Sequence, residues 1–196
     1  CARQPCGALQ FGAVPVRALR RLPPLPRERG ARAAALACGA ALLLAALAAL
    51  PPETQTDPLI YHYGIPARIL LLHRYAPCPE NIPAHFPPLW EALLLPLLAF
   101  GGEGATRWFA PALLGLLVLG AFRLARPGLG ARGAWFAAAL TASSPFLAGH
   151  VSSAKNDLLA AVLGLAAFAS LSPARGASGP ALAGVLAGGA FAVKYS

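Results

Sequence analysis

Residues 33–50 read AAALACGAALLLAALAAL, and this stretch decides the fold class. The run carries no charged side chain, with Arg32 before it and Pro51 directly after it. A helix needs about 20 apolar residues to cross the hydrocarbon core of a bilayer. The run is longer than a cleaved signal sequence needs, although a signal anchor would also fit it. We therefore expect residues 33–50 to form a membrane-spanning helix.

The whole chain has the composition of an integral membrane protein. Hydrophobic residues make up 57% of the 196 residues and 12% are charged, and the mean hydropathy is +0.60. A typical soluble domain carries about 25% charged residues. Further apolar runs bring the expected number of spans to about five, and they cover residues 108–122, 133–149, 158–172 and 180–193. We predict an all-α fold, a polytopic membrane helical bundle.

The charged residues are unevenly distributed along the chain. Seven of the sixteen basic residues fall within residues 1–32, and five of the seven acidic residues fall within residues 51–104. Basic segments stay on the cytoplasmic side of a membrane, so we attribute the net charge of +9 to orientation. The stacking aromatic pattern of nucleic-acid-binding proteins is missing, and we predict no nucleic-acid partner. Residues 1–32 are expected to be a basic cytoplasmic segment, and residues 33–196 a transmembrane domain with outer loop 51–107.

Both ends of the chain look like internal positions of a longer protein. Met is absent, and the chain stops at Tyr195-Ser196, in or just after an apolar run. We therefore expect a fragment. The high content of Ala, Arg, Gly and Pro is typical of a GC-rich bacterial genome, which predicts the bacterial inner membrane as the location. The four cysteines form no pair on the outer side and show no metal-ligand spacing, so we predict no disulfide, no metal and no cofactor.

The outer loop contains two segments that we interpret as surface helices. Residues 86–102 include a short apolar core that Glu91 and Pro96 interrupt. If this segment crossed the membrane, the three arginines that follow the next apolar run would face outside, against the positive-inside rule. We expect it to lie on the outer membrane surface. The same interpretation applies to residues 58–74.

Asp57 and Asp157 are the only aspartates of the chain, and the predicted topology places both on the outer side. Asp57 lies close to the end of the first expected span, and Asp157 directly precedes the expected span 158–172. An acidic residue at the membrane boundary is expensive to desolvate and often marks a functional site. The alternative is that each aspartate caps a helix, since Asp57 precedes Pro58 and Asp157 precedes an apolar helix.

Several short motifs in order resemble the GT-C glycosyltransferases. They are TDPLIYHYGIP at 56–66, HFPPLWEALLLPLLAFGG at 85–102, KNDLLA at 155–160 and AVKYS at 192–196. The closest similarity is to bacterial members related to protein mannosyltransferases and aminoarabinose transferases, and it covers roughly residues 33–196. It implies transfer of a sugar from a polyprenyl-phosphate donor, embedded in the lipid bilayer, to an acceptor hydroxyl on the outer face.

The resemblance also implies roles for individual residues. Asp57 matches the catalytic aspartate of the first outer loop, where a carboxylate can act as the base, and Asp157 matches the acidic position of the second outer loop. Glu91 falls in the surface-helix motif. Many members carry a second acidic residue directly after the first aspartate, whereas this chain has Pro58 there.

Basic residues of the outer side are the candidate substrate contacts. The departing phosphate needs cationic or hydrogen-bonding partners, and the candidates are Lys155, Arg68 and Arg74. Each of them would also fit an interfacial cation that extends to the headgroups. His62 can bind substrate or assist proton transfer, or it can simply hydrogen-bond at the interface. A phosphate-binding Gly-rich loop is missing, which disfavours a soluble nucleotide-sugar donor.

A non-catalytic polytopic protein is the alternative, either a transporter or an assembly subunit whose acidic residues line a path or cap helices. Transporters place polar residues near the middle of the membrane, at broken helices. Here both aspartates are expected at the boundary, which favours the enzyme.

Overall fold

The computed structural model describes residues 26–76, 79, 85, 88–172 and 176–194. Within these residues the regular elements are all helical, which confirms the predicted all-α class. The elements are α1 (Arg29–Ala48), the π-helix η2 (Pro58–His62), α2 (Gly64–Leu72), α3 (Leu89–Ala142), α4 (Pro145–Val151), α5 (Asp157–Ser170) and α6 (Ser178–Val193).

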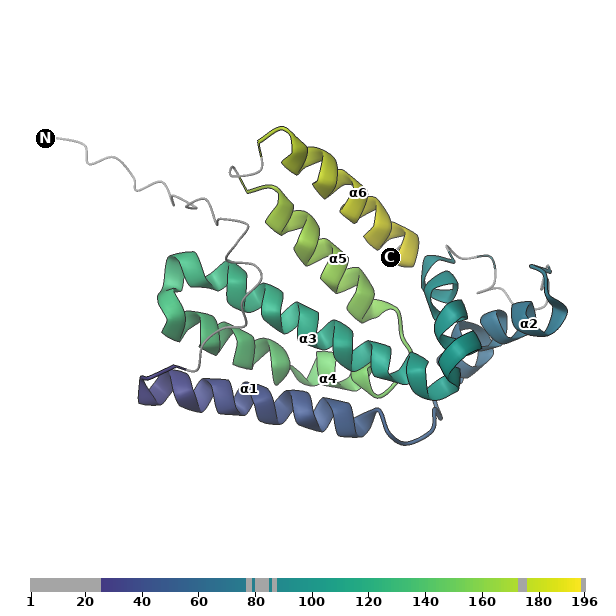
Figure 1. Ribbon diagram of the computed structural model, residues 1–196, viewed down its shortest axis with the longest axis horizontal. Coiled ribbons are helices and arrows are strands. Elements are labelled where there is room, and N and C mark those ends of the chain that lie inside the picture. The colour runs from purple at the N-terminus through teal and green to yellow at the C-terminus, as the bar shows by residue number, and fades with distance from the viewer. Residues whose placement is uncertain (1–25, 77–78, 80–84, 86–87, 173–175, 195–196) are drawn as a thin grey trace, which may run out of the picture.

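Two glycines divide the long helix α3 into three segments, 89–101, 103–129 and 131–142. Gly102 has φ 65° and ψ −164°, and Gly130 has φ 64° and ψ −172°. This backbone region is essentially restricted to glycine because a Cβ would clash there. The chain therefore changes direction at both positions, and segment 103–129 and segment 131–142 run in opposite directions (Figure 1).

The helices run between two ends of a bundle (Figure 1). One end of the bundle holds η2, α2 and the first segment of α3, together with the C-terminal end of α1, the start of α5 and the end of α6. The Gly130 turn lies at the other end. We call the first the acid end, because its elements carry Glu53, Asp57, Glu91, Glu103 and Asp157. The other is the arginine end, formed by Arg29, Arg32, Arg123, Arg126 and Arg132.

The arginine end is held where α1 and α3 approach each other closely. The guanidinium of Arg132 lies over the first turn of α1, since a Cβ on Gly30 would be 3.7 Å from Arg132 Nε. The basic residues near the start of α1 therefore lie at the same end of the bundle as those after residue 122, as predicted from the sequence. Exposed Glu28 is the one described acidic residue near this end.

The core lies between α1, α3 and α5, nearer the acid end. Trp90, Leu94, Leu114 and Leu158 are fully buried there. Gly120 brings α3 and α5 together, because a Cβ at this position would lie 2.6 Å from Leu165 Cδ2. The absent side chain is thus what permits this close approach.

The predicted spans match helices, with shifted boundaries. Residues 33–48 of the run 33–50 lie in α1, which begins earlier and includes Arg29 and Arg32. The run 133–149 does not form one helix, because α3 ends at Ala142 and α4 begins at Pro145. Ser144 is extended, with ψ 119°, as expected for a residue that precedes proline.

The two segments expected to be surface helices form parts of α3, η2 and α2. The part of segment 86–102 that begins at Leu89 forms the first part of α3, and Gly102 turns it away from segment 103–129, so that it stays at the acid end (Figure 1). Segment 58–74 is not one helix but two short ones, η2 and α2, which meet at Tyr63.

Much of the apolar surface faces outward. Within the described residues, α1 and α3 are long and apolar enough to cross a membrane. Only 17% of the most apolar stretch of α1 and 28% of that of α3 is buried inside the protein. The core helix of a soluble protein would be mostly buried instead. Large exposed apolar side chains occur on several helices and include Leu36, Leu44, Leu140, Phe168, Val185 and Phe191.

Candidate functional site

Asp57 stands at the start of η2 with its side chain exposed. Pro58 follows at the first helical position, but the Asp57 carboxylate makes no capping hydrogen bond. No hydrogen bond or ion pair joins Asp57 to another residue that the structure describes. Capping by its side chain, the alternative considered from the sequence, is therefore not observed for Asp57. The carboxylate is available to a ligand or to solvent.

The turn that follows Asp57 is a π-helix. The backbone N–H of Tyr63 donates to the carbonyl of Pro58 at 2.8 Å, five residues earlier. Short π-helical turns are rare and are frequently found at functional sites. This turn directs Tyr61 and His62 differently from a regular helix, and it buries His62 while Tyr61 remains half-exposed.

His62 and Glu91 form a buried pair. His62 Nδ1 lies 2.6 Å from Glu91 Oε1, and the two side chains are 1% and 10% exposed. The ring of Trp90 meets His62 edge-on at 6.2 Å between centroids. This contact joins η2 to the first turn of α3. The two sequence candidates His62 and Glu91 are therefore each other's partners.

Asp157, the first residue of α5, contacts two basic side chains from neighbouring elements. Lys194 Nζ lies 2.5 Å from Asp157 Oδ1, and His150 Nε2 lies 3.2 Å from Asp157 Oδ2. Burial opposes ionisation of Asp157, but the hydrogen bond and charge of Lys194, together with His150, outweigh it and lower the pKa of this carboxyl. The side chain is thus ionised and fixed between α4 and α6.

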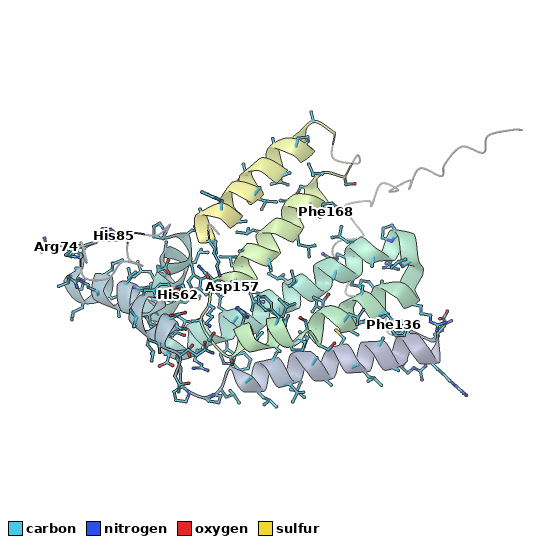
Figure 2. All side chains as sticks on the ribbon, turned by 180° about the vertical axis from the view of Figure 1, so that it is seen from behind. His62, Arg74, His85, Phe136, Asp157 and Phe168 are labelled. Atoms are coloured by element: carbon cyan, nitrogen blue, oxygen red, sulfur yellow. The ribbon has the colours of Figure 1, made fainter. Side chains whose placement is uncertain are left out.

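Tyr61 lies near three acidic residues. Burial raises the pKa of its phenol, and the negative charges of Asp57, Glu91 and Asp157 raise it further. Carboxylates from three separate segments therefore lie close enough to act on one hydroxyl group. Figure 2 shows His62, the neighbour of Tyr61, and Asp157 at the same end of the bundle. The hydroxyl stays protonated at neutral pH and can donate a hydrogen bond.

The three basic candidates are placed differently. Lys155 is half-buried, two residues before Asp157, and Arg68 is half-buried on α2. Arg74 is exposed and lies beside His85 at the far tip of the molecule, away from Asp157 (Figure 2). The structure therefore does not bring Arg74 to the acidic residues, which corrects its grouping with Lys155 as a phosphate partner.

Three further residues belong to this cluster although they were not among the sequence candidates. They are Tyr61, His150 and Lys194. Tyr61 belonged to the TDPLIYHYGIP motif without a role of its own, and His150 had no signal, since nothing in a single sequence pairs it with Asp157. Lys194 belonged to the AVKYS motif, but its ion pair with Asp157 depends on the antiparallel packing of α5 and α6. Tyr195 lies outside the described residues.

The cluster can carry out acid–base and anion-binding chemistry. Asp57 offers an exposed carboxylate, Tyr61 a protonated hydroxyl, and Lys194 and Lys155 positive charge. Among the described residues no group of three His, Cys, Asp or Glu side chains could hold a metal ion. Cys38 is buried and unpaired in α1, whereas Cys1, Cys6 and Cys78 lie outside the residues that the structure describes.

Comparison of this chain with protein-family models, curated proteins and solved structures finds no match.

Proposed function

We propose that the protein is a membrane glycosyltransferase that moves a sugar from a polyprenyl-phosphate donor to an acceptor hydroxyl at the acid end. The proposal is supported chiefly by the acid end, where three separate segments bring Asp57, Glu91 and Asp157 to the same end of the bundle. Of these carboxylates, Glu91 and Asp157 have partners, and Asp57 alone is exposed with no described partner. A general base must be accessible to the substrate proton that it accepts.

In the proposed orientation the helical bundle spans the bacterial inner membrane. The arginine end faces the cytoplasm, in line with the positive-inside rule, and the acid end faces outward. The outward-facing apolar side chains of α1 and α3 would contact lipid tails. The exposed carboxylate would then lie near the headgroup level, where the phosphate of a polyprenyl-linked donor is also located.

The reaction needs one proton transfer and one displacement. Asp57 takes the proton of the acceptor hydroxyl while the oxygen attacks the anomeric carbon of the donor sugar. The bond from that carbon to the phosphate oxygen breaks, and the polyprenyl phosphate leaves with the electron pair. Lys155 and the Tyr61 hydroxyl would stabilise the negative charge on the departing phosphate. Neither step requires a soluble nucleotide.

One observation favours the alternative of a non-catalytic polytopic protein. Asp157 is paired with both Lys194 and His150, as expected for a structural ion cluster that joins helices. The alternative has no use for the exposed, unpaired Asp57, and the charged cluster lies at the end of the bundle and not at its middle. For these reasons we favour the enzyme.

The test is transfer of a labelled sugar from a polyprenyl-phosphate donor by the full-length protein in lipid vesicles, with release of polyprenyl phosphate as the readout. Asp57→Asn keeps the size of the side chain and removes the base, so transfer should fall by about 10²-fold or more. Glu28→Gln makes the same chemical change at the arginine end and should have no effect. Equal transfer by both variants would refute the assignment of Asp57.

Orientation is tested separately with a membrane-impermeant thiol reagent added to intact cells. Cys78 follows α2 in the expected outer loop and should react, whereas buried Cys38 should not. Protection of Cys78 would contradict the proposed outward orientation of the acid end.

A further inference from the structure

We infer that Glu53 and Arg107 form a buried clamp that sets the position of Asp57 relative to Asp157, and that they act as positioning residues for the reaction proposed above. The inference rests on that proposed function for its activity readout, but its geometric part can be tested without any substrate. Neither residue was a candidate from the sequence.

Glu53 joins two distant segments through its carboxylate. Its side chain is largely buried, with the whole residue 7% exposed. Oε1 accepts hydrogen bonds from the backbone N–H groups of Thr54 and Gln55, each at 2.9 Å. Oε2 accepts from the N–H of Ala154 at 3.0 Å. A buried carboxylate is costly unless it is fully hydrogen-bonded, so this bridge is tightly specified.

Arg107 joins the same two segments through backbone carbonyls. It is 5% exposed, and its Nε donates to the carbonyl of Ala49 at 2.9 Å. Its Nη2 donates to the carbonyl of Ser152 at 3.2 Å. Ala49 is the C-cap of α1 and Ser152 the C-cap of α4, where carbonyl groups lack helical partners. One guanidinium therefore fastens two helix ends to each other.

Glu103 and Trp90 complete the clamp from α3. Glu103 Oε1 accepts from the backbone N–H of Glu53 at 2.8 Å and lies 3.6 Å from Arg107 Nη1. The indole N–H of Trp90 donates to the carbonyl of Ala154 at 2.9 Å. Both backbone hydrogen-bonding groups of Ala154 are thus taken by clamp residues.

The clamp holds the residues directly before each aspartate. Ala49 to Gln55 lead into Asp57, and Ser152 to Ala154 lead into Asp157, three residues on. A shift in either segment would change the distance between the exposed carboxylate and the paired one. Because the side chains of Glu53 and Arg107 are buried, they do not meet substrate themselves. Their effect on the reaction is therefore exerted through the position of the aspartates.

The geometric test uses spin labels on cysteines at Thr56 and Lys155, one beside each aspartate, in full-length protein whose native cysteines are replaced by serine. Continuous-wave electron paramagnetic resonance reports the distribution of distances between the labels. We expect a narrow distribution in the parent protein and a broader one with Glu53→Gln, because an amide cannot accept on both sides. Glu28→Gln, at the arginine end, is the matched control and should match the parent.

The kinetic test compares Glu53→Gln with Glu28→Gln in unlabelled protein, with polyprenyl-phosphate sugar as the donor probe. Misplacement of a catalytic group by about 1 Å can cost about 100-fold, so kcat should fall by about 100-fold while the KM for the donor stays nearly unchanged. A merely structural role would lower the amount of folded protein and leave kcat per folded molecule unaltered.

The outcomes separate the two proposals. An unchanged distance distribution in Glu53→Gln overturns the clamp, whatever the activity. A parent protein without transfer activity would overturn the proposed function, and the spin-label distances would still decide on the clamp. If Glu53→Gln does not fold, Glu103→Ala takes its place, since the Glu103 side chain is half-exposed and its removal leaves the N–H of Glu53 without its acceptor. This variant should broaden the distribution, and no broadening would overturn the clamp.

Discussion

Replacement of Glu91 by alanine should destabilise the protein by about 3 kcal/mol. The change removes the partner of His62, which is 1% exposed and bound to Glu91 at 2.6 Å. Hydrogen bonds that involve a charged group contribute about 1.5–3 kcal/mol, and a buried group left without its partner is the costly case. Glu91 also lies in the first turn of α3, where a negative charge adds about 0.3–1 kcal/mol.

The assay is the free energy of unfolding in detergent micelles, measured by urea titration and followed by circular dichroism. The control is Glu28→Ala, because Glu28 also stands at the start of a helix but is exposed and makes no side-chain capping bond. A surface substitution of this kind should change stability by no more than about 0.5 kcal/mol. The two variants therefore differ in the buried contact and share the loss of a carboxylate.

A double-mutant cycle with His62→Ala isolates the pair. If the two side chains depend on each other, the double variant should be more stable than the sum of the single effects predicts, by about 1–3 kcal/mol. Additive effects, or a Glu91→Ala protein as stable as the Glu28→Ala control, would refute the reasoning. Either result would mean that the pair does not hold η2 against α3.

Three further predictions concern the turn, the ion cluster and the phenol. Gly102→Ala should cost about 1–3 kcal/mol, because Gly102 has a positive φ, whereas Gly104→Ala in the open helix should stabilise by about 0.5–1 kcal/mol; equal effects in the same urea titrations would contradict this account of the kink. The pKa of Asp157 is lowered from 3.8 because its bond to Lys194 outweighs the opposing effect of burial. Its contribution is therefore present above pH 3.8 and lost as the pH falls through the lower folded-state pKa. As the pH falls below 3.8, the free energy of unfolding should therefore decrease less in Lys194→Met than in the parent. The same dependence of stability on pH in both proteins would refute the pairing. Burial and nearby carboxylates raise the pKa of Tyr61 above 10.0, so its stabilising effect is present below that pH and lost as the pH rises through the folded-state pKa. In a pH titration followed by ultraviolet absorbance, Tyr61→Phe should remove a phenol that ionises above pH 10.0. Loss of a phenol that ionises at the usual tyrosine pKa would contradict the placement of Tyr61 near the carboxylates.

Local patterns in the sequence were enough to predict the helical class and most helix positions. Residues 33–48 of the charge-free run lie in α1, whereas Glu91 and Pro96 do not interrupt α3, whose change of direction is at Gly102. These features depend on neighbouring residues alone. The membrane itself and the number of spans stay predictions, which the labelling experiment addresses.

The contacts that build the site could not be predicted in the same way. Glu53 looked like an ordinary loop residue, yet it bonds to Ala154, 101 residues away. Lys194 meets Asp157 across 37 residues because α5 and α6 pack antiparallel. Such pairings depend on how helices pack, and a single sequence carries little information about packing. The π-helix was missed for a related reason, since Pro58 marks a helix start without specifying the type of helix.

The most direct test of the central claim is the rate at which full-length Asp57→Asn transfers sugar from a polyprenyl-phosphate donor in lipid vesicles. The exposed, unpaired carboxylate at the acid end predicts a loss of about 10²-fold or more, with expression unchanged. Transfer at the parental rate would contradict the claim that Asp57 is the base.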